Sequence, residues 1–306
     1  VQFRDPGLTH KADILTESRA AAAGGVTSIM DMPNTNPLTV TLDALNAKLD
    51  LLNEKCIVNH SCYFGATNNN YTEFDKLDKH RVCGIKLFMG SSTGNMLVDK
   101  MNSLLNIFNG TDMLIAAHCE DQETIKNNIE KYKQKYKGAD DIPVSAHPSI
   151  RSVPACYASS ELAVRLAKIA GARLHILHVS TAKELQLFSD EPLANKNITA
   201  EACVAHLLFT LTHYNSLGAR IKCNPAVKRK TDREALRTAV NSGLIDVIAT
   251  DHAPHSEEDK LKGMAGMVGS ETAFGVCYTK LCKQEGLPLE VLVHLMSTRP
   301  AEILGL

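Results

Sequence analysis

The chain lacks the sequence features that mark several broad classes of protein. Its apolar runs fall far short of the roughly 20 residues that span a bilayer. It does not open on a basic stretch followed by an apolar one, as a secretory leader does. Excess charge of either sign is also missing, because 33 Lys and Arg residues balance 34 Asp and Glu residues. We therefore expect neither a membrane partner nor a nucleic-acid partner.

Paired cysteines are missing too. The nine cysteines are an odd number, they are scattered along the chain, and none forms a Cys-x-x-Cys pair. This pattern argues against a disulfide framework and against a structural zinc finger, and it favours reduced thiols in the cytoplasm. A basic and aromatic run at residues 131–137 has helical spacing and predicts a solvent-exposed helix face, to which we assign no function.

The apolar residues form a repeating pattern. Short β-branched and apolar runs are each followed by a longer stretch with helical spacing, which predicts parallel βαβ units. The expected strands are Val1–Phe3, Thr27–Met32, Val58–Phe64, Gly84–Phe88, Leu114–His118, Leu174–His178, Ile198–Cys203 and Ile245–Asp251. Eight such units predict an α/β fold, a (β/α)8 TIM barrel in a single domain over residues 1–306. The competing doubly wound sheet usually carries a glycine-rich phosphate turn after its first strand, and none is present.

One long segment interrupts this pattern. Residues 138–154 are predicted to form a loop, which is long for a connection in such a fold. The segment could close over a site as a lid or be a passive insertion, and the sequence favours neither. His147 within it is a histidine to test.

Polar residues stand at the ends of three predicted strands. His118 and His178 end the fifth and sixth strands, and Asp251 ends the eighth. Each alone has a structural explanation, as a hydrogen-bonded histidine or a helix cap. The carboxyl ends of barrel strands meet at one face, however, so together they predict a site that holds Zn²⁺ through imidazole and carboxylate.

Lys86 lies inside the fourth predicted strand, between apolar neighbours. Burial of its ammonium group lowers the pKa and makes a neutral amine accessible. Such an amine can react with CO₂ to give an anionic carbamate that bridges two cations. An ion pair with a nearby carboxylate is an equal alternative at this stage.

Taken in order, the motifs resemble those of the cyclic amidohydrolases of the amidohydrolase superfamily, and most closely the dihydroorotase family. The matching segments are Phe3-Arg4-Asp5-Pro6-Gly7, Met32-Pro33-Asn34-Thr35-Asn36-Pro37, Gly84-Ile85-Lys86-Leu87-Phe88, the two strand-end histidines and Asp251-His252-Ala253-Pro254-His255. The resemblance continues to residues 297–301 and so covers essentially the whole chain. Each motif is moderately specific, and the ordered set is strongly so.

The resemblance implies a metal centre. His118 and His178 would bind the second of two zinc ions, Lys86 as its carbamate would bridge both, and Asp251 would bind the first. A hydroxide between the cations would attack the ring amide carbonyl, and Asp251 would carry the proton to the departing nitrogen. The reaction would open dihydroorotate to N-carbamoyl-aspartate, and its reverse would close the ring in pyrimidine biosynthesis.

The resemblance also implies a small-molecule substrate site. Arg4, Asn34 and His255 would hold the substrate carboxylate, and Asn224 would lie near the pyrimidine ring. A guanidinium and an amide at neighbouring strand ends suit a carboxylate on physical grounds as well. Structural alternatives are a surface salt bridge for Arg4 and a turn before proline for Asn34. A homodimer is a further possibility.

One position departs from the family pattern. The family's first strand usually carries His-x-His, whose second histidine falls on Gln2 and whose first would precede Val1. A glutamine oxygen is a neutral and weaker ligand than imidazole, so we expect one or two zinc ions per chain, with Gln2 a poor ligand of the first. The family's small β domain, built from segments flanking the barrel, has no counterpart here, so we expect an excised barrel.

Two other functions remain open. A sister cyclic amidohydrolase acting on hydantoins, dihydropyrimidines or allantoin would keep the metal residues but would not need the Arg4 and Asn34 pair. A non-catalytic barrel that organises a partner enzyme would lose ligands, as Gln2 suggests. The catalytic functions are favoured because the four expected metal residues are present: Lys86, His118, His178 and Asp251.

Overall fold

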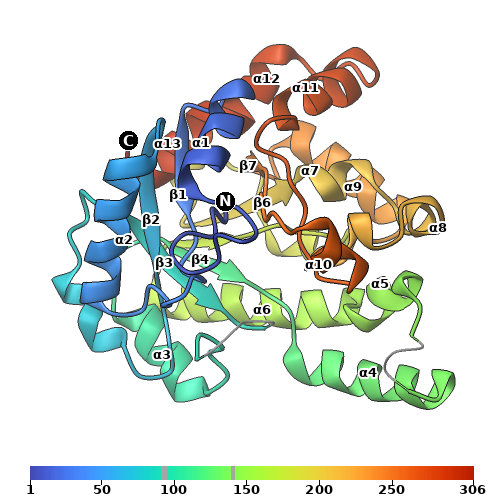
Figure 1. Ribbon diagram of the computed structural model, residues 1–306, viewed down its shortest axis with the longest axis horizontal. Coiled ribbons are helices and arrows are strands. Elements are labelled where there is room, and N and C mark those ends of the chain that lie inside the picture. The colour runs from blue at the N-terminus through green and yellow to red at the C-terminus, as the bar shows by residue number, and fades with distance from the viewer. Residues whose placement is uncertain (91–94, 139–141) are drawn as a thin grey trace.

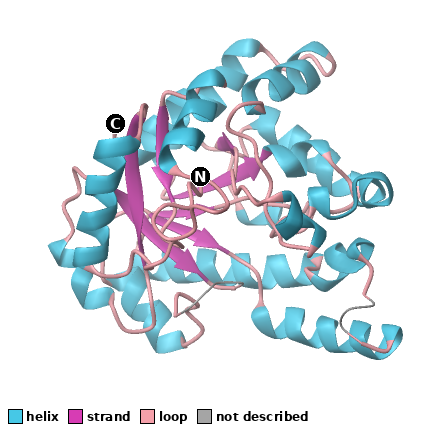
Figure 2. Ribbon diagram, in the orientation of Figure 1, coloured by secondary structure: helices cyan, strands magenta, loops and turns pink. Residues whose placement is uncertain are grey.

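The parallel strands of the chain form one curled sheet. The computed structural model describes residues 1–306 except 91–94 and 139–141. Seven parallel strands lie in the order of the sequence: β1 (Ser28–Asp31), β2 (Asn59–Gly65), β3 (Val82–Phe88), β4 (Ile115–His118), β5 (Leu174–Ile176), β6 (Ile198–Cys203) and β7 (Val247–Ala249). Helices surround the sheet on the outside (Figures 1 and 2). The predicted α/β barrel architecture is confirmed, with one strand fewer than predicted among the described residues.

The missing strand is the first one. Residues 1–3 were predicted to be a strand, yet they have no strand conformation. They still bond to both neighbours, because Val1 O accepts from Met32 N at 3.0 Å and Gln2 N donates to His252 O at 2.7 Å. So short a segment cannot build the repeated ladder of a strand. It nevertheless bridges the ends of β1 and β7 and brings Gln2 to the edge where the strands end.

Helices follow most strands, as the alternating pattern predicts. They are α1 (Ile14–Ala23), α2 (Leu42–Lys55), α3 (Met101–Asn109), α4 (Gln122–Tyr136), α5 (His147–Ile150), α6 (Val153–Ala170), α7 (Val204–Leu208), α8 (Tyr214–Leu217), α9 (Lys230–Ser242), α10 (Glu257–Leu261), α11 (Ala273–Cys277), α12 (Leu289–Val293) and α13 (Arg299–Leu304). The Ser152 side chain caps α6 by accepting from Ala155 N, and Gly171 ends it in the left-handed conformation at φ 66°. The basic run at 131–137 lies at the end of α4, whose only fully buried residue is Ile125, so the exposed helix face predicted there is confirmed.

Strand alternation separates the core from the site. On β3, Ile85 and Leu87 are fully buried in the main apolar core, which also contains residues of the outer helices. Lys86 lies between them and lines an internal cavity. Because successive side chains of a strand point to opposite faces, the apolar packing on one side fixes the direction of Lys86 on the other.

The segment at 138–154 is not the long loop that was predicted. Residues Val144–Ala146 form a 3₁₀ turn, α5 follows directly, and α6 begins at Val153. Residues 139–141 lie outside the described part of the chain. Short helical turns of this length carry too little periodicity to be recognised in a sequence.

The surface and redox expectations can also be compared with the structure. Over the described ranges, no helix is both long enough and apolar enough to cross a bilayer. All nine cysteines lie in these ranges and are free thiols, as predicted.

Candidate metal and substrate site

All the predicted site residues line one cavity. The cavity has a volume of about 1180 Å³ and reaches the carboxyl ends of the strands. The predicted residues in its wall are Gln2, Arg4, Asn34, Lys86, His118, His178, Asn224, Asp251 and His255. Parallel strands end at the same edge, so residues up to 253 positions apart in the sequence meet there.

The two strand-end histidines converge on each other. His118 Nδ1 lies 3.1 Å from His178 Nε2, and both side chains are buried. Burial lowers the pKa of both imidazoles, which favours the neutral form that binds metals. Zn–N bonds of 2.0–2.1 Å in tetrahedral geometry would separate two ligand nitrogens by roughly 3.3 Å. The observed separation therefore suits two ligands of one cation.

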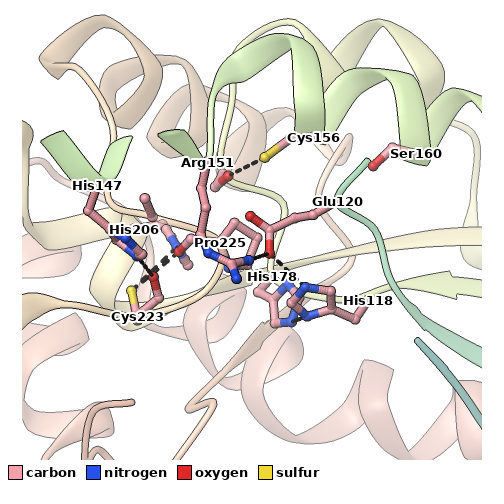
Figure 3. A network of polar contacts seen from close by, with 12 residues as sticks. His118, Glu120, His147, Arg151, Cys156, Ser160, His178, His206, Cys223 and Pro225 are labelled. Atoms are coloured by element: carbon pink, nitrogen blue, oxygen red, sulfur yellow. Dashed lines mark hydrogen bonds and ion pairs between the residues drawn. The ribbon is translucent and has the colours of Figure 1, made fainter. Parts of the chain in front are cut away.

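A buried carboxylate fixes the ring of His118. Glu120 Oε2 lies 2.7 Å from His118 Nε2, and Arg151 forms an ion pair with the same oxygen (Figure 3). Burial alone would raise the pKa of Glu120, but the Arg151 charge and the hydrogen bond from His118 lower it to about 2. A proton on Nε2 that donates to Glu120 leaves the Nδ1 lone pair directed at His178. This carboxylate–histidine arrangement is typical of metal-binding histidines.

Lys86 is buried, and none of the described residues is its polar partner. Its side chain is 3% exposed, and Nζ lies 4.1 Å from the centre of the Phe88 ring. Nζ has no hydrogen bond or ion pair with any residue in the described ranges, so the ion pair considered from the sequence is not observed. Burial lowers the pKa of Lys86 to about 8, against the opposing charge of Asp251. A neutral amine is therefore accessible near neutral pH.

Asp251 faces the same cavity from the end of β7. Burial and the nearby charge of Glu201 raise its pKa to about 7, against the opposing charges of the N-terminal ammonium group, Lys86 and Arg4. Such a carboxyl group can both accept and release a proton near neutral pH.

Glu201 is a site residue that the sequence analysis did not single out. It lies on β6, is 8% exposed, lines the cavity, and accepts a hydrogen bond from the backbone N–H of His178 at 3.1 Å. Its other oxygen lies 3.2 Å from His175 Nε2. An acidic residue inside an apolar strand was the signal that could have identified it. Arg151 had no comparable signal, because only the fold brings it to Glu120.

The residues predicted to hold a carboxylate form a hydrogen-bonded group. Arg4 donates to Gln2 Oε1 at 2.6 Å and to Pro254 O at 3.0 Å, and its third nitrogen lies 3.0 Å from His255 Nε2. Asn34 Nδ2 donates to the same Gln2 oxygen at 3.1 Å. Arg4, Asn34 and His255 are thus brought together: Gln2 joins Arg4 to Asn34, and Arg4 contacts His255.

Backbone strain is concentrated at this site. The non-glycine residues with positive φ in the described ranges are Arg4 at 67°, His178 at 38°, Asp251 at 44° and Lys137 at 60°. Lys137 ends helix α4, whereas the other three are predicted site residues. Strain of about 1–3 kcal/mol per residue persists only where the surrounding structure imposes it, and it is common at functional sites.

Comparison with known proteins identifies the family. The model of the amidohydrolase family matches residues 2–306. The chain belongs to this family. Two curated relatives of this amidohydrolase are named dihydroorotase. The relative from Fusobacterium nucleatum is 31% identical, with coverage of 100% of this chain and 71% of its own length. The relative from Lactobacillus helveticus is 33% identical, with coverage of 100% and 72%.

Solved structures agree with this assignment. The L-hydantoinase (dihydropyrimidinase) from Arthrobacter aurescens matches with a TM-score of 0.92 and 28% identity, over 100% of this chain and 69% of that one. The dihydropyrimidinase from Brevibacillus agri NCHU1002 matches with a TM-score of 0.85 and 19% identity, over 96% and 67%. The second likeness shows a shared fold.

The two halves of the site differ in how well they fit a metal ion. In this amidohydrolase, His118 and His178 present converging nitrogens. Lys86 offers an amine in the same cavity that has no polar partner among the described residues, so this half fits a divalent cation. The Gln2 oxygen is already occupied by two donors, so the other half does not fit one. In the part of the chain that the structure describes, no three His, Cys, Asp or Glu residues are grouped closely enough to hold a metal ion by themselves.

Proposed function

We propose that this amidohydrolase is a dihydroorotase, which hydrolyses the cyclic amide of (S)-dihydroorotate to N-carbamoyl-L-aspartate and closes the ring in the reverse direction, a step of pyrimidine biosynthesis. The observation that carries the proposal is the cluster of Arg4, Asn34 and His255 beside the His118 and His178 pair. An anionic ring needs such a carboxylate site next to the reacting centre. The curated relatives named dihydroorotase, 31% and 33% identical, support it.

His118, His178 and Lys86 would hold a divalent cation, with zinc as the expected metal. Lys86 would first react with CO₂, so that its nitrogen forms a bond to carbon and loses one proton, which gives an anionic carbamate. A bound divalent cation would polarise the ring amide carbonyl and lower the pKa of a bound water.

The residues of the chain would supply binding and proton transfer. Arg4, Asn34 and His255 would hold the substrate carboxylate, and Asn224 would lie along the ring. Asp251, across the same cavity, would take the proton of the attacking water and return it to the ring nitrogen as the amide bond breaks. The carboxylate contacts orient the ring for attack.

The experiment compares substrates of different charge. We expect turnover of dihydroorotate, and we expect Arg4→Ala to lower its kcat/KM by about 30-fold, the equivalent of about 2 kcal/mol for a charged hydrogen bond. Arg220→Ala, which removes an exposed arginine, is the matched control. Faster turnover of uncharged hydantoin or dihydrouracil, unaffected by Arg4→Ala, would instead favour a hydantoinase, the function named for the Arthrobacter aurescens structure.

A further inference from the structure

The cavity wall has two halves with different chemistry. One half carries the converging nitrogens of His118 and His178, together with the Lys86 amine. The other half carries Gln2 and Arg4, which come from the N-terminal segment that bridges β1 and β7. The hydrogen bonds and charges around the ligand atoms of each half decide whether a cation can bind there.

Both lone pairs of the Gln2 amide oxygen already accept hydrogen bonds. A carbonyl oxygen has two lone pairs, and Gln2 Oε1 already accepts from Arg4 at 2.6 Å and from Asn34 at 3.1 Å. A cation bound to this oxygen would have to displace both donors. Displacement would deprive these partly buried N–H groups of their acceptor, and a fully buried group left in this way costs about 1–3 kcal/mol.

Charge opposes a cation at Gln2 as well. The Arg4 guanidinium is 6% exposed and in direct contact with the Gln2 oxygen. It is held there by Pro254 O and lies against His255, so it cannot swing away without losing further contacts. Two positive charges a few ångströms apart in a partly buried site repel each other strongly.

The histidine half has the opposite properties. The carboxylate of Glu120 satisfies His118 Nε2, which leaves Nδ1 directed toward His178 Nε2. The charge of Arg151 is neutralised by Glu120. Besides burial, the Lys86 ammonium lowers the pKa of both imidazoles, and its charge is removed when it loses its proton. The half with His118 and His178 therefore suits a cation, and the half with Gln2 and Arg4 suits an anion.

We propose that Gln2 is a positioning residue for the anion site and not a metal ligand, so that the centre holds one divalent cation per chain. The Gln2 oxygen keeps the Arg4 and Asn34 side chains next to each other, which preorganises them for a carboxylate. The identity of that carboxylate as the one on dihydroorotate rests on the proposed function; the cation count does not.

The decisive experiment counts cations without substrate. The full chain is stripped with a chelator, dialysed against zinc chloride with bicarbonate, and analysed for zinc by plasma mass spectrometry. We expect one equivalent per chain, lost in His178→Ala and retained in His80→Ala, an exposed control. Two tight equivalents, or none, would overturn the proposal, whether or not the protein turns over dihydroorotate.

A second variant separates ligand from positioning residue. Gln2→Met keeps the side-chain length and removes the acceptor, so we expect unchanged zinc content and a KM for dihydroorotate raised about tenfold, with kcat changed less. A loss of zinc in Gln2→Met would identify Gln2 as a ligand and contradict the proposal. An unchanged KM in a protein that does turn over dihydroorotate would remove the positioning role.

Discussion

The orientation of His118 depends on a buried carboxylate, Glu120. Glu120 is fully buried, contacts His118 Nε2 at 2.7 Å and is itself neutralised by Arg151. Carboxylates in this position set the tautomer and the ring angle of a metal-binding histidine. If the centre binds zinc as proposed, its affinity should therefore depend on Glu120 as well as on the two imidazoles.

We expect Glu120→Gln to weaken zinc binding by about 10- to 100-fold, the usual effect of removing such a partner. The amide keeps the shape of the side chain but loses the charge that pairs with Arg151. Competition with a chromophoric chelator measures the zinc Kd directly. The control is Glu123→Gln, which changes an exposed residue of α4. Equal zinc affinity in the two variants would show that Glu120 does not orient His118 for zinc.

His206 gives the fold a dependence on pH. Its side chain is buried on α7, where Nε2 lies 2.8 Å from Pro225 O, and burial lowers its pKa to about 4. In the unfolded chain the imidazole has its ordinary pKa of about 6.5, so the unfolded chain binds the proton more tightly than the folded one. The contribution of His206 to the free energy of unfolding is therefore fully present above about pH 6.5 and is lost as the pH falls toward 4. We expect the free energy of unfolding to fall by about 2 kcal/mol between pH 7.5 and pH 5 because of this histidine.

The measurement is urea unfolding at the two pH values. In His206→Gln, whose amide can still donate to Pro225 O, the difference in unfolding free energy between pH 7.5 and pH 5 should shrink by about 2 kcal/mol. An identical pH dependence in both proteins would show that His206 is not responsible.

At the scale of the elements, a buried ion pair ties the end of β1 to α2. Lys48 Nζ lies 2.7 Å from Asp31 Oδ2 with both side chains fully buried. The other oxygen of Asp31 accepts from Phe3 N at 2.9 Å, which anchors the N-terminal segment that carries Gln2 and Arg4. The pair therefore links the outer helix layer to the position of the site.

We expect Lys48→Met to destabilise the fold by about 3–5 kcal/mol, because it leaves the Asp31 carboxylate buried without its partner. Adding Asp31→Asn should recover much of this loss, since the amide is neutral and can still accept from Phe3 N. Thermal unfolding of the two single variants and the double variant gives the coupling energy. Additive losses would mean that the ion pair contributes nothing.

The elements differ in how far the sequence could predict them. β2 to β7 fall within the predicted runs or extend them by at most two residues, because buried parallel strands are nearly continuous apolar runs. The prediction of a strand at residues 1–3 was wrong, because the hydrogen bonds of this segment are made at the ends of β1 and β7, which are distant in sequence. The prediction of a loop at residues 138–154 was also wrong, because a helix of only four residues, such as α5, has too little periodicity to be recognised in the sequence.

For the molecule as a whole, the topology explains which site residues were predictable. His118, His178 and Asp251 end their strands, so a parallel barrel brings them to one face whatever its details. The hydrogen bonds of Gln2 and the pairing of Arg151 with Glu120 depend on side-chain directions that no local pattern fixes. The sequence therefore predicted which residues meet in the cavity, and the structure was needed to see how their side chains are paired.

We propose that residues 1–306 form a single domain, because β1 to β7 follow one another in one sheet and the N-terminal segment bonds to both ends of it. Removing any strand would expose the core shared by its neighbours, so no part should unfold alone. We expect urea unfolding followed by far-UV circular dichroism, which reports the helices, to coincide with unfolding followed by the near-UV tyrosine signal. Separated midpoints would divide the chain into independent units. Zinc bound at the proposed centre should then shift both curves together, since His118 ends β4 and His178 follows β5, two strands of the same cooperative unit.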